Sequence, residues 1–235
     1  MTPEIQAVFF DMGETLYTYK DLPLSWKDHF QAAWQEALTA CGYFPDELEL
    51  STLSGYMGRF NTREVAREVE YDSNHILGGA LESIGCDSVP LSGVTSNFFN
   101  YFRNSLSPYP ETAAALEMLR TRNIKVGALT DVAYGMPRAF IADDLKQVGI
   151  LHLIDVWKTS VDIGFRKPSP KGLAHLCALS GCRPESAIYV GNERKDVQAA
   201  NNAGLISVLI HRSGLPEPDW GQEHTIHSLM DCPGC

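Results

Sequence analysis

The chain has 235 residues, of which 44% are hydrophobic and 20% charged, and its formal net charge is −10. This composition is typical of a globular protein with one large domain, or one domain with a sizeable insertion. The acidic balance argues against nucleic acid or an anionic membrane as the main partner. No apolar run approaches the ~18 residues that a membrane-spanning helix needs. The N-terminal residues lack a basic region and a long apolar region, so we expect no secretory signal and a cytoplasmic protein.

The start of the chain predicts one strand, and a long helical segment follows it. Residues 5–10 form a short apolar run that is typical of a buried strand, closed by Asp11 and Gly13. Residues 22–106 have a helical pattern without convincing strands. The helices expected in this segment are 24–42, 62–71, 75–84 and 95–105.

After residue 107, apolar strands alternate with helices. The expected strands are 124–130, 155–160, 186–192 and 206–210, and the expected helices are 110–123, 137–148, 170–180 and 195–204. Such an alternation predicts an α/β fold with a parallel sheet that is covered on both faces. We therefore predict a core formed by residues 1–16 and 107–235, with residues 17–106 as an inserted helical subdomain.

Polar residues stand at the carboxyl ends of these strands, where open α/β sheets bind their ligands. They are Asp11, Thr130, Asp131, the loop 160–168 and residues 191–193. Asp11 can attack phosphorus, Thr130 can donate a hydrogen bond to a phosphoryl oxygen, and Lys167 supplies fixed positive charge. Carboxylates from two strand ends can also share a divalent cation such as Mg²⁺. The pattern predicts a phosphate-transfer site.

Four stretches, in order, resemble the motifs of the haloacid dehalogenase-like hydrolase superfamily. They are FFDMGETL, VGALTD, FRKPSP and YVGNERKDVQAANNAG, and each follows an apolar strand or an expected strand end. The resemblance implies a phosphatase-type member with a Rossmann-like core and an α-helical cap. It also implies that Asp11 is nucleophile and metal ligand, that the Gly13 carbonyl is a second ligand, and that Lys167 and Thr130 bind phosphate. We count Asp131 with this phosphate-binding group.

Two positions depart from the family pattern. Gly13 stands where the phosphatases usually carry an aspartate that protonates the leaving group and activates water, and losing such catalysis costs roughly 10²- to 10⁴-fold. Asn192 stands where a metal-binding aspartate is usual. We therefore expect Mg²⁺ at Asp11, Gly13 and Asn192, bound more weakly than usual, with Glu193 and Asp196 near enough to assist.

The expected function is hydrolysis of a small phosphorylated metabolite through an aspartyl-phosphate, and two alternatives stay open. Gly13 and Asn192 favour a non-catalytic protein that binds a phosphorylated ligand. In the other alternative, a 2-haloacid dehalogenase, Asp11 attacks carbon and an arginine of the cap gathers the substrate carboxylate; Arg59 and Arg63 are the nearest arginines. The substrate and the oligomeric state do not follow from the sequence.

The six cysteines do not have the spacing of a disulfide framework. Cys232 and Cys235 form a CxxC motif, but no second CxxC completes a set of four zinc ligands. We expect a reduced protein in which this motif lies in a loose tail.

Overall fold

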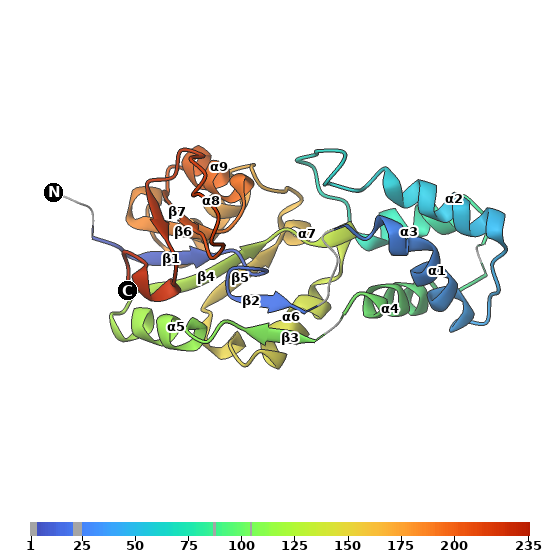
Figure 1. Ribbon diagram of the computed structural model, residues 1–235, viewed down its shortest axis with the longest axis horizontal. Coiled ribbons are helices and arrows are strands. Elements are labelled where there is room, and N and C mark those ends of the chain that lie inside the picture. The colour runs from blue at the N-terminus through green and yellow to red at the C-terminus, as the bar shows by residue number, and fades with distance from the viewer. Residues whose placement is uncertain (1–3, 21–24, 87, 104) are drawn as a thin grey trace. The chain divides into compact units, whose positions relative to one another are not determined.

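The computed structural model describes residues 4–20, 25–86, 88–103 and 105–235, and these residues fall into two compact units (Figure 1). The first unit comprises the chain up to Thr18, together with Leu106–Asp131 and Arg138–Cys235. The second unit runs from Tyr19 to Ser105 and also takes in Val132–Pro137.

The first unit is built on a six-stranded parallel sheet, and the predicted α/β class is confirmed. In sheet order its strands are β5 (Val156–Thr159), β4 (Lys125–Thr130), β1 (Ala7–Phe10), β6 (Ala187–Gly191), β7 (Ile206–Ile210) and β8 (His224–Ile226). The strand β8 was not among the predicted strands. The first strand in the chain thus lies inside the sheet, between two strands that come more than a hundred residues later.

Helices cover this sheet on both faces (Figure 1). They are α5 (Thr112–Thr121), α6 (Arg138–Gln147), α7 (Ser160–Ile163), α8 (Lys171–Ser180) and α9 (Arg194–Ala203). Figure 1 shows α8 and α9 on one side of β1 and β4, with α5 on the other. All four residues of β1 are buried, as a parallel strand with two covered faces requires. Gly127 of β4 lies beside Phe9, and a Cβ on Gly127 would come within 2.6 Å of the Phe9 ring, so the missing side chain makes room for that ring.

A second, two-stranded sheet joins β2 (Tyr17–Tyr19) and β3 (Leu106–Pro108). These strands lie at two of the four points where the chain passes from one unit to the other. Neither strand was predicted, because three residues are too short to show an alternating pattern.

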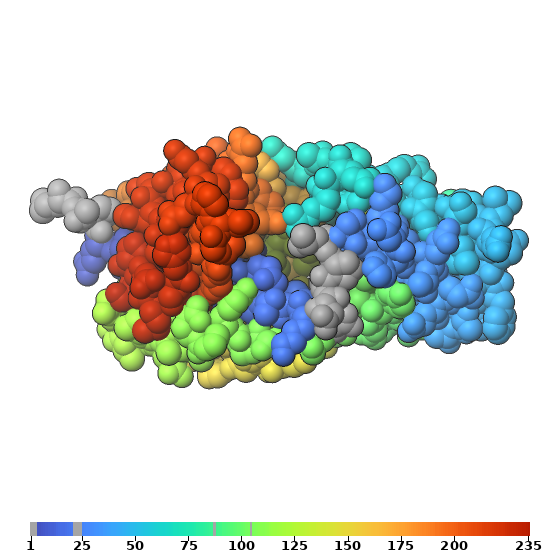
Figure 2. Space-filling view, in the orientation of Figure 1, coloured from blue at the N-terminus to red at the C-terminus, as the bar shows by residue number. Residues whose placement is uncertain are grey.

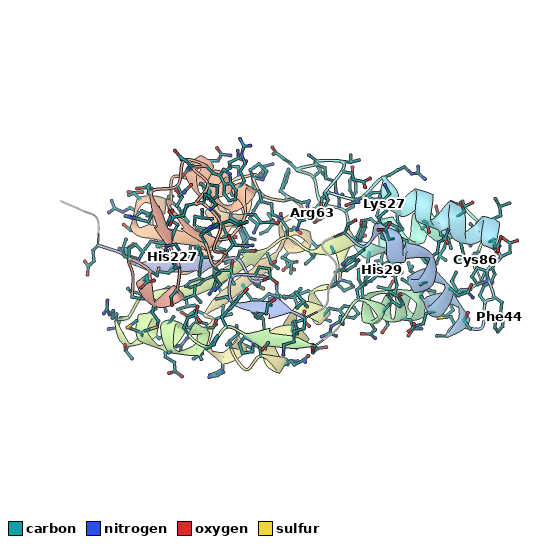
Figure 3. All side chains as sticks on the ribbon, in the orientation of Figure 1. Lys27, His29, Phe44, Arg63, Cys86 and His227 are labelled. Carbon is teal, nitrogen blue, oxygen red and sulfur yellow. The ribbon has the colours of Figure 1, made fainter. Side chains whose placement is uncertain are left out.

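The second unit is helical and has its own aromatic core. Its helices are α1 (Phe30–Thr39), α2 (Glu47–Gly58), α3 (Ser73–Glu82) and α4 (Leu91–Tyr101). Trp34 of α1 packs on Phe98 of α4, with ring centroids 5.0 Å apart. Phe44, labelled in Figure 3, lies outside this core and is 76% exposed.

The segment Val132–Pro137 packs into the second unit although it directly follows β4. The Tyr134 ring meets the rings of Phe30 and Trp26 at 5.3 and 5.5 Å. Gly135 has φ +67°, and a Cβ there would lie 2.4 Å from the backbone of Asp72. Only glycine allows this approach of two backbones.

One predicted helix of the second unit is wrong and one helix was missed. Residues 62–71 form turns and extended chain. Within them the Arg67 guanidinium donates to the carbonyl of Phe60 at 2.7 Å and pairs with Glu70 at 3.1 Å, which fixes a non-helical path. The missed helix, α2, buries only two apolar residues, so its periodicity is weak, but the capping box of Asp46 and Glu49 marks its start.

The C-terminal residues are not a loose tail, contrary to the prediction. Leu229 and Cys232 are buried, and the short 3₁₀ helix Leu229–Asp231 lies beside α5 (Figure 1). Figure 2 shows the last residues, in red, spread over the surface of the first unit. Among the described residues, no helix is long and apolar enough to cross a membrane.

Candidate active site

Strand β1 carries Asp11 to the carboxyl edge of the sheet. The backbone N–H of Asp11 donates to the carbonyl of Val190 at 2.8 Å, which continues the pairing with β6 one residue past the strand. The residue is 8% exposed, so its carboxylate lies in a largely buried position. The apolar run before it therefore fixes where this carboxylate stands.

Lys167 meets Asp11 across 156 residues of sequence. Its ammonium lies 2.7 Å from the Asp11 carboxylate, 2.6 Å from the Asp196 carboxylate and 2.9 Å from the Tyr189 hydroxyl. The Tyr189 hydroxyl in turn donates to the carbonyl of Leu129 at 2.9 Å. The contacts with Asp11 and Tyr189 are hydrogen bonds, and the contact with Asp196 is an ion pair. The ammonium is thus held in place between two carboxylates.

The pKa values of this group reflect burial and close charges. Burial raises the pKa of the Asp11 carboxyl from 3.8 to about 6, while Lys167 opposes the rise and Asp196 adds to it. Burial acts to lower the pKa of the Lys167 ammonium, but Asp11 and Asp196 outweigh it and hold this pKa well above 10.5. At neutral pH the site therefore holds an ionised carboxylate beside a permanent cation.

Asp131 gathers further positive charge at the end of β4. Its carboxylate accepts the backbone N–H of Lys167 at 3.2 Å and lies 3.4 Å from the Lys195 ammonium and 3.9 Å from the Arg166 guanidinium. Burial acts to raise the pKa of Asp131, but Lys167, Arg166 and Lys195 outweigh it and keep this pKa below 3.8. Thr130, the last residue of β4, is 8% exposed at the same edge of the sheet.

The loop after β1 lies against the loop after β6. The Thr15 hydroxyl donates to the side-chain oxygen of Asn192 at 3.3 Å. Gly13, between Asp11 and Thr15, forms an isolated bridge with Tyr17. These contacts place the neutral residues Gly13 and Asn192 on neighbouring loops, and Gly13 is two residues from Asp11.

Three acidic side chains near the site are held by other groups. Glu14, which follows Gly13 in the chain, accepts hydrogen bonds from Thr18 at 2.7 Å and Tyr109 at 2.9 Å. Asp196 accepts the backbone N–H of Glu193 at 2.8 Å besides its ion pair with Lys167. The Glu193 carboxylate lies 2.7 Å from Lys195. Within the described ranges, no group of three or more acidic, histidine or cysteine side chains is arranged to hold a metal ion.

Comparison with known proteins identifies the family of the chain. A family model described as haloacid dehalogenase-like hydrolase matches residues 5–204. The chain belongs to this family. Haloacid dehalogenase-like relatives include the glyceraldehyde 3-phosphate phosphatase of Methanopyrus kandleri, 32% identical over 88% of this chain and 84% of that protein. The phosphoglycolate phosphatase of Neisseria meningitidis serogroup A is 27% identical over 92% of this chain and 88% of that protein.

Solved structures of this hydrolase family have the same fold. A 2-haloacid dehalogenase from Pseudomonas syringae pv. Tomato has a TM-score of 0.68 at 21% identity, over 97% of this chain and 96% of the other. A phosphatase from Thermococcus onnurineus has a TM-score of 0.62 at 24% identity, over 96% of this chain and 94% of the other. The predicted family and the predicted class, a phosphatase-type hydrolase, are confirmed by the family model and the curated relatives.

Three residues of the hydrolase site were not predicted from the sequence. Tyr189 lies inside an apolar strand, a pattern that indicates an aromatic residue of the core. Arg166 and Lys195 lie in polar stretches, a pattern that is typical of exposed loops. One signal was available: Lys195 stands one residue before Asp196 at the start of α9, so both side chains begin near the same sheet edge.

Replacing Lys167 by methionine should destabilise the hydrolase by about 3–5 kcal/mol, because a buried ion pair loses one partner. Asp11 and Asp196 would then face each other without a cation, in positions where both are largely buried. Burial already raises the pKa of the Asp11 carboxyl to about 6, so protonation of Asp11 would relieve the repulsion and the loss should shrink as the pH falls toward about 4. Urea unfolding at both pH values measures this effect. The exposed Lys125→Met is the matched control, and an equal loss of stability in both variants would contradict the expectation.

Proposed function

We propose that the chain hydrolyses a small phosphate monoester through an aspartyl-phosphate on Asp11. The observation that carries this proposal is the buried Asp11 carboxylate with the Lys167 ammonium 2.7 Å away at the carboxyl edge of a parallel sheet. The names of the curated relatives, which are phosphatases of glyceraldehyde 3-phosphate and phosphoglycolate, support a small phosphorylated metabolite as substrate. The assignment of residues 17–106 as the cap stays a prediction.

In the first step, Asp11 attacks phosphorus and the bond to the leaving oxygen breaks. The main difficulty is that a carboxylate must approach an anion, so fixed positive charge matters most. Lys167 and the cations around Asp131 supply such charge without any rearrangement. Thr130, at the same edge, can donate its hydroxyl to a phosphoryl oxygen.

In the second step, water attacks the aspartyl-phosphate and frees Asp11. No carboxylate at position 13 assists either step, and Glu14 is held by Thr18 and Tyr109. We therefore expect a low turnover rate. The rate should depend strongly on the leaving group, because an alkoxide must be protonated to leave, whereas an aryl oxide leaves with little protonation.

The donor set near Asp11 suits Mg²⁺, which prefers oxygen ligands and needs only one or two carboxylates from the protein. The residues that would hold it are Asp11, the Gly13 carbonyl and the side-chain oxygen of Asn192, which Thr15 orients. The predicted auxiliary ligands Glu193 and Asp196 are held by Lys195 and Lys167, so they would have to leave those partners. When bound, Mg²⁺ would lessen the repulsion between the carboxylate and the phosphate.

The experiment that tests the proposal is turnover of p-nitrophenyl phosphate with and without Mg²⁺. We expect phosphate release, because this leaving group tolerates the absence of an acid at Gly13. The release should depend on Mg²⁺, because the metal ion lessens the repulsion between Asp11 and the phosphate. A folded protein that binds phosphate but releases none from this substrate would favour the non-catalytic alternative. Metal-independent release of halide from a 2-haloacid would favour the dehalogenase.

A further inference from the structure

The C-terminal CxxC motif closes a tight turn. The backbone N–H of Cys235 donates to the carbonyl of Cys232 at 2.7 Å. Such a four-residue turn keeps its first and last Cα atoms within about 7 Å, and a disulfide needs a separation of about 4.4–6.8 Å. The same turn brings the first and last side chains of the motif to one side of the short 3₁₀ helix, where the Cys235 thiol lies 3.4 Å from the carbonyl of Leu229. The backbone is therefore arranged for a bond between the two sulfur atoms.

This turn is fixed to the core of the first unit. A Cβ on Gly234 would come within 2.8 Å of Val8 in β1 and 3.2 Å of Leu119 in α5, so the turn lies flat against both elements. The Cys235 thiol also donates to the carbonyl of Leu229 at 3.4 Å. Because the packing holds the turn, the two thiols stay near each other, and no backbone rearrangement is needed to bring them together.

The two thiols have different surroundings. Cys232 is 3% exposed, while Cys235 is partly exposed. The neighbouring Cys232 side chain and the charge of Arg122 lower the pKa of the Cys235 thiol, although burial opposes them. The neighbouring Cys235 side chain and burial raise the pKa of Cys232. The accessible thiol is thus also the one that more readily becomes a thiolate, which is the nucleophilic form.

We propose that Cys232 and Cys235 form a reversible disulfide by exchange with a low-molecular-weight disulfide such as oxidised glutathione. The Cys235 thiolate attacks one sulfur of that disulfide and expels a thiolate, which leaves a mixed disulfide on Cys235. Cys232 then loses its proton to solvent and attacks the Cys235 sulfur, which expels the second thiolate. Two protein thiols are oxidised, one external disulfide is reduced to two thiols, and neither metal nor oxygen takes part.

A second pair of cysteines in the same unit provides an internal comparison. The Cys182 thiol donates to the carbonyl of Cys177 at 3.8 Å at the end of α8. Burial raises the pKa of both thiols, to about 12 for Cys177. Neither of them has the lowered pKa that distinguishes Cys235, so this pair should stay reduced.

The test is incubation of the full chain in glutathione buffers of increasing oxidised fraction at a pH near 8, close to the usual thiol pKa. Thiols are then counted after acid quenching and unfolding, and cross-links are mapped in peptides. We expect the loss of two of the six thiols, a cross-link from Cys232 to Cys235, and full recovery with dithiothreitol. Retention of all six thiols, a cross-link elsewhere, or a mixed disulfide that persists on Cys235 would each overturn the proposal.

Two variants separate the roles of the thiols. Cys232→Ser should stop at the mixed disulfide, and the partly exposed Cys235→Ser should lose no pair of thiols. Cys182→Ser is the matched control and should still form the cross-link. Circular dichroism of each variant checks that it is folded, and the Cys235→Ser result decides the case if the buried Cys232→Ser does not fold.

Discussion

Asp11→Asn should lower the turnover of p-nitrophenyl phosphate by ~10³-fold or more, because an amide cannot replace a carboxylate nucleophile. The variant should nevertheless fold. Lys167 keeps its ion pair with Asp196 at 2.6 Å, so one buried cation still faces one buried anion. The raised pKa of Asp11 means that the fold disfavours its charge, and removing that charge should leave the free energy of unfolding at neutral pH unchanged or slightly higher.

The measurement pairs steady-state kinetics with urea unfolding of the same sample. Lys167→Met provides the contrast, since it leaves two anions without a cation and should lose stability as well as activity. A folded Asp11→Asn variant that keeps most of its turnover would remove Asp11 from the role of nucleophile. A variant that does not fold would contradict the charge argument, although it would say nothing about the chemistry.

Gly13→Asp should raise the turnover of an alkyl phosphate by roughly 10²- to 10⁴-fold, the usual contribution of a general acid–base group. The increase should be much smaller for p-nitrophenyl phosphate, whose leaving group needs little protonation. The ratio of the two rates is therefore the informative quantity. It cancels differences in protein concentration and in the active fraction.

Gly13→Asn is the matched control for this change. It adds a side chain of nearly the same size at the same position but cannot donate and take back a proton. If Gly13→Asn changes the ratio as much as Gly13→Asp, the effect comes from the backbone or from the metal ligands, and the acid–base explanation is wrong. If neither variant changes the ratio, some other group already protonates the leaving oxygen.

The elements that the sequence predicts correctly are those with strong patterns. The apolar strands around Gly127 and Tyr189 are unbroken, and α8 ends at Gly181 in the left-handed conformation that glycine favours. Residues 62–71 have apolar residues at helical spacing. Val65 and Val69 are about half exposed, so the apolar surface buried there is too small to stabilise a helix. The local sequence pattern does not show whether another part of the fold packs against an apolar face.

The same limit applies to the candidate site. Asp11 and Lys167 follow from their places at strand ends, and the structure joins them directly. The role of Asp196 as an auxiliary metal ligand stays a prediction, while its ion pair with Lys167 and its place in the capping box of α9 were not predicted. Tyr189 was not predicted, because its role depends on an ammonium 22 residues earlier in the chain. Contacts of this kind depend on side-chain direction, which one sequence alone does not give.

The place of β1 inside the sheet has a consequence for synthesis of the protein on the ribosome. The strand that carries Asp11 is made before both of its neighbours in the sheet, which begin at Lys125 and Ala187. Contacts between segments so distant in sequence form late, because long loops must close first. A growing chain therefore contains Asp11 long before Lys167 and Asp196 have been made, and the three side chains can come together only after α9 has emerged.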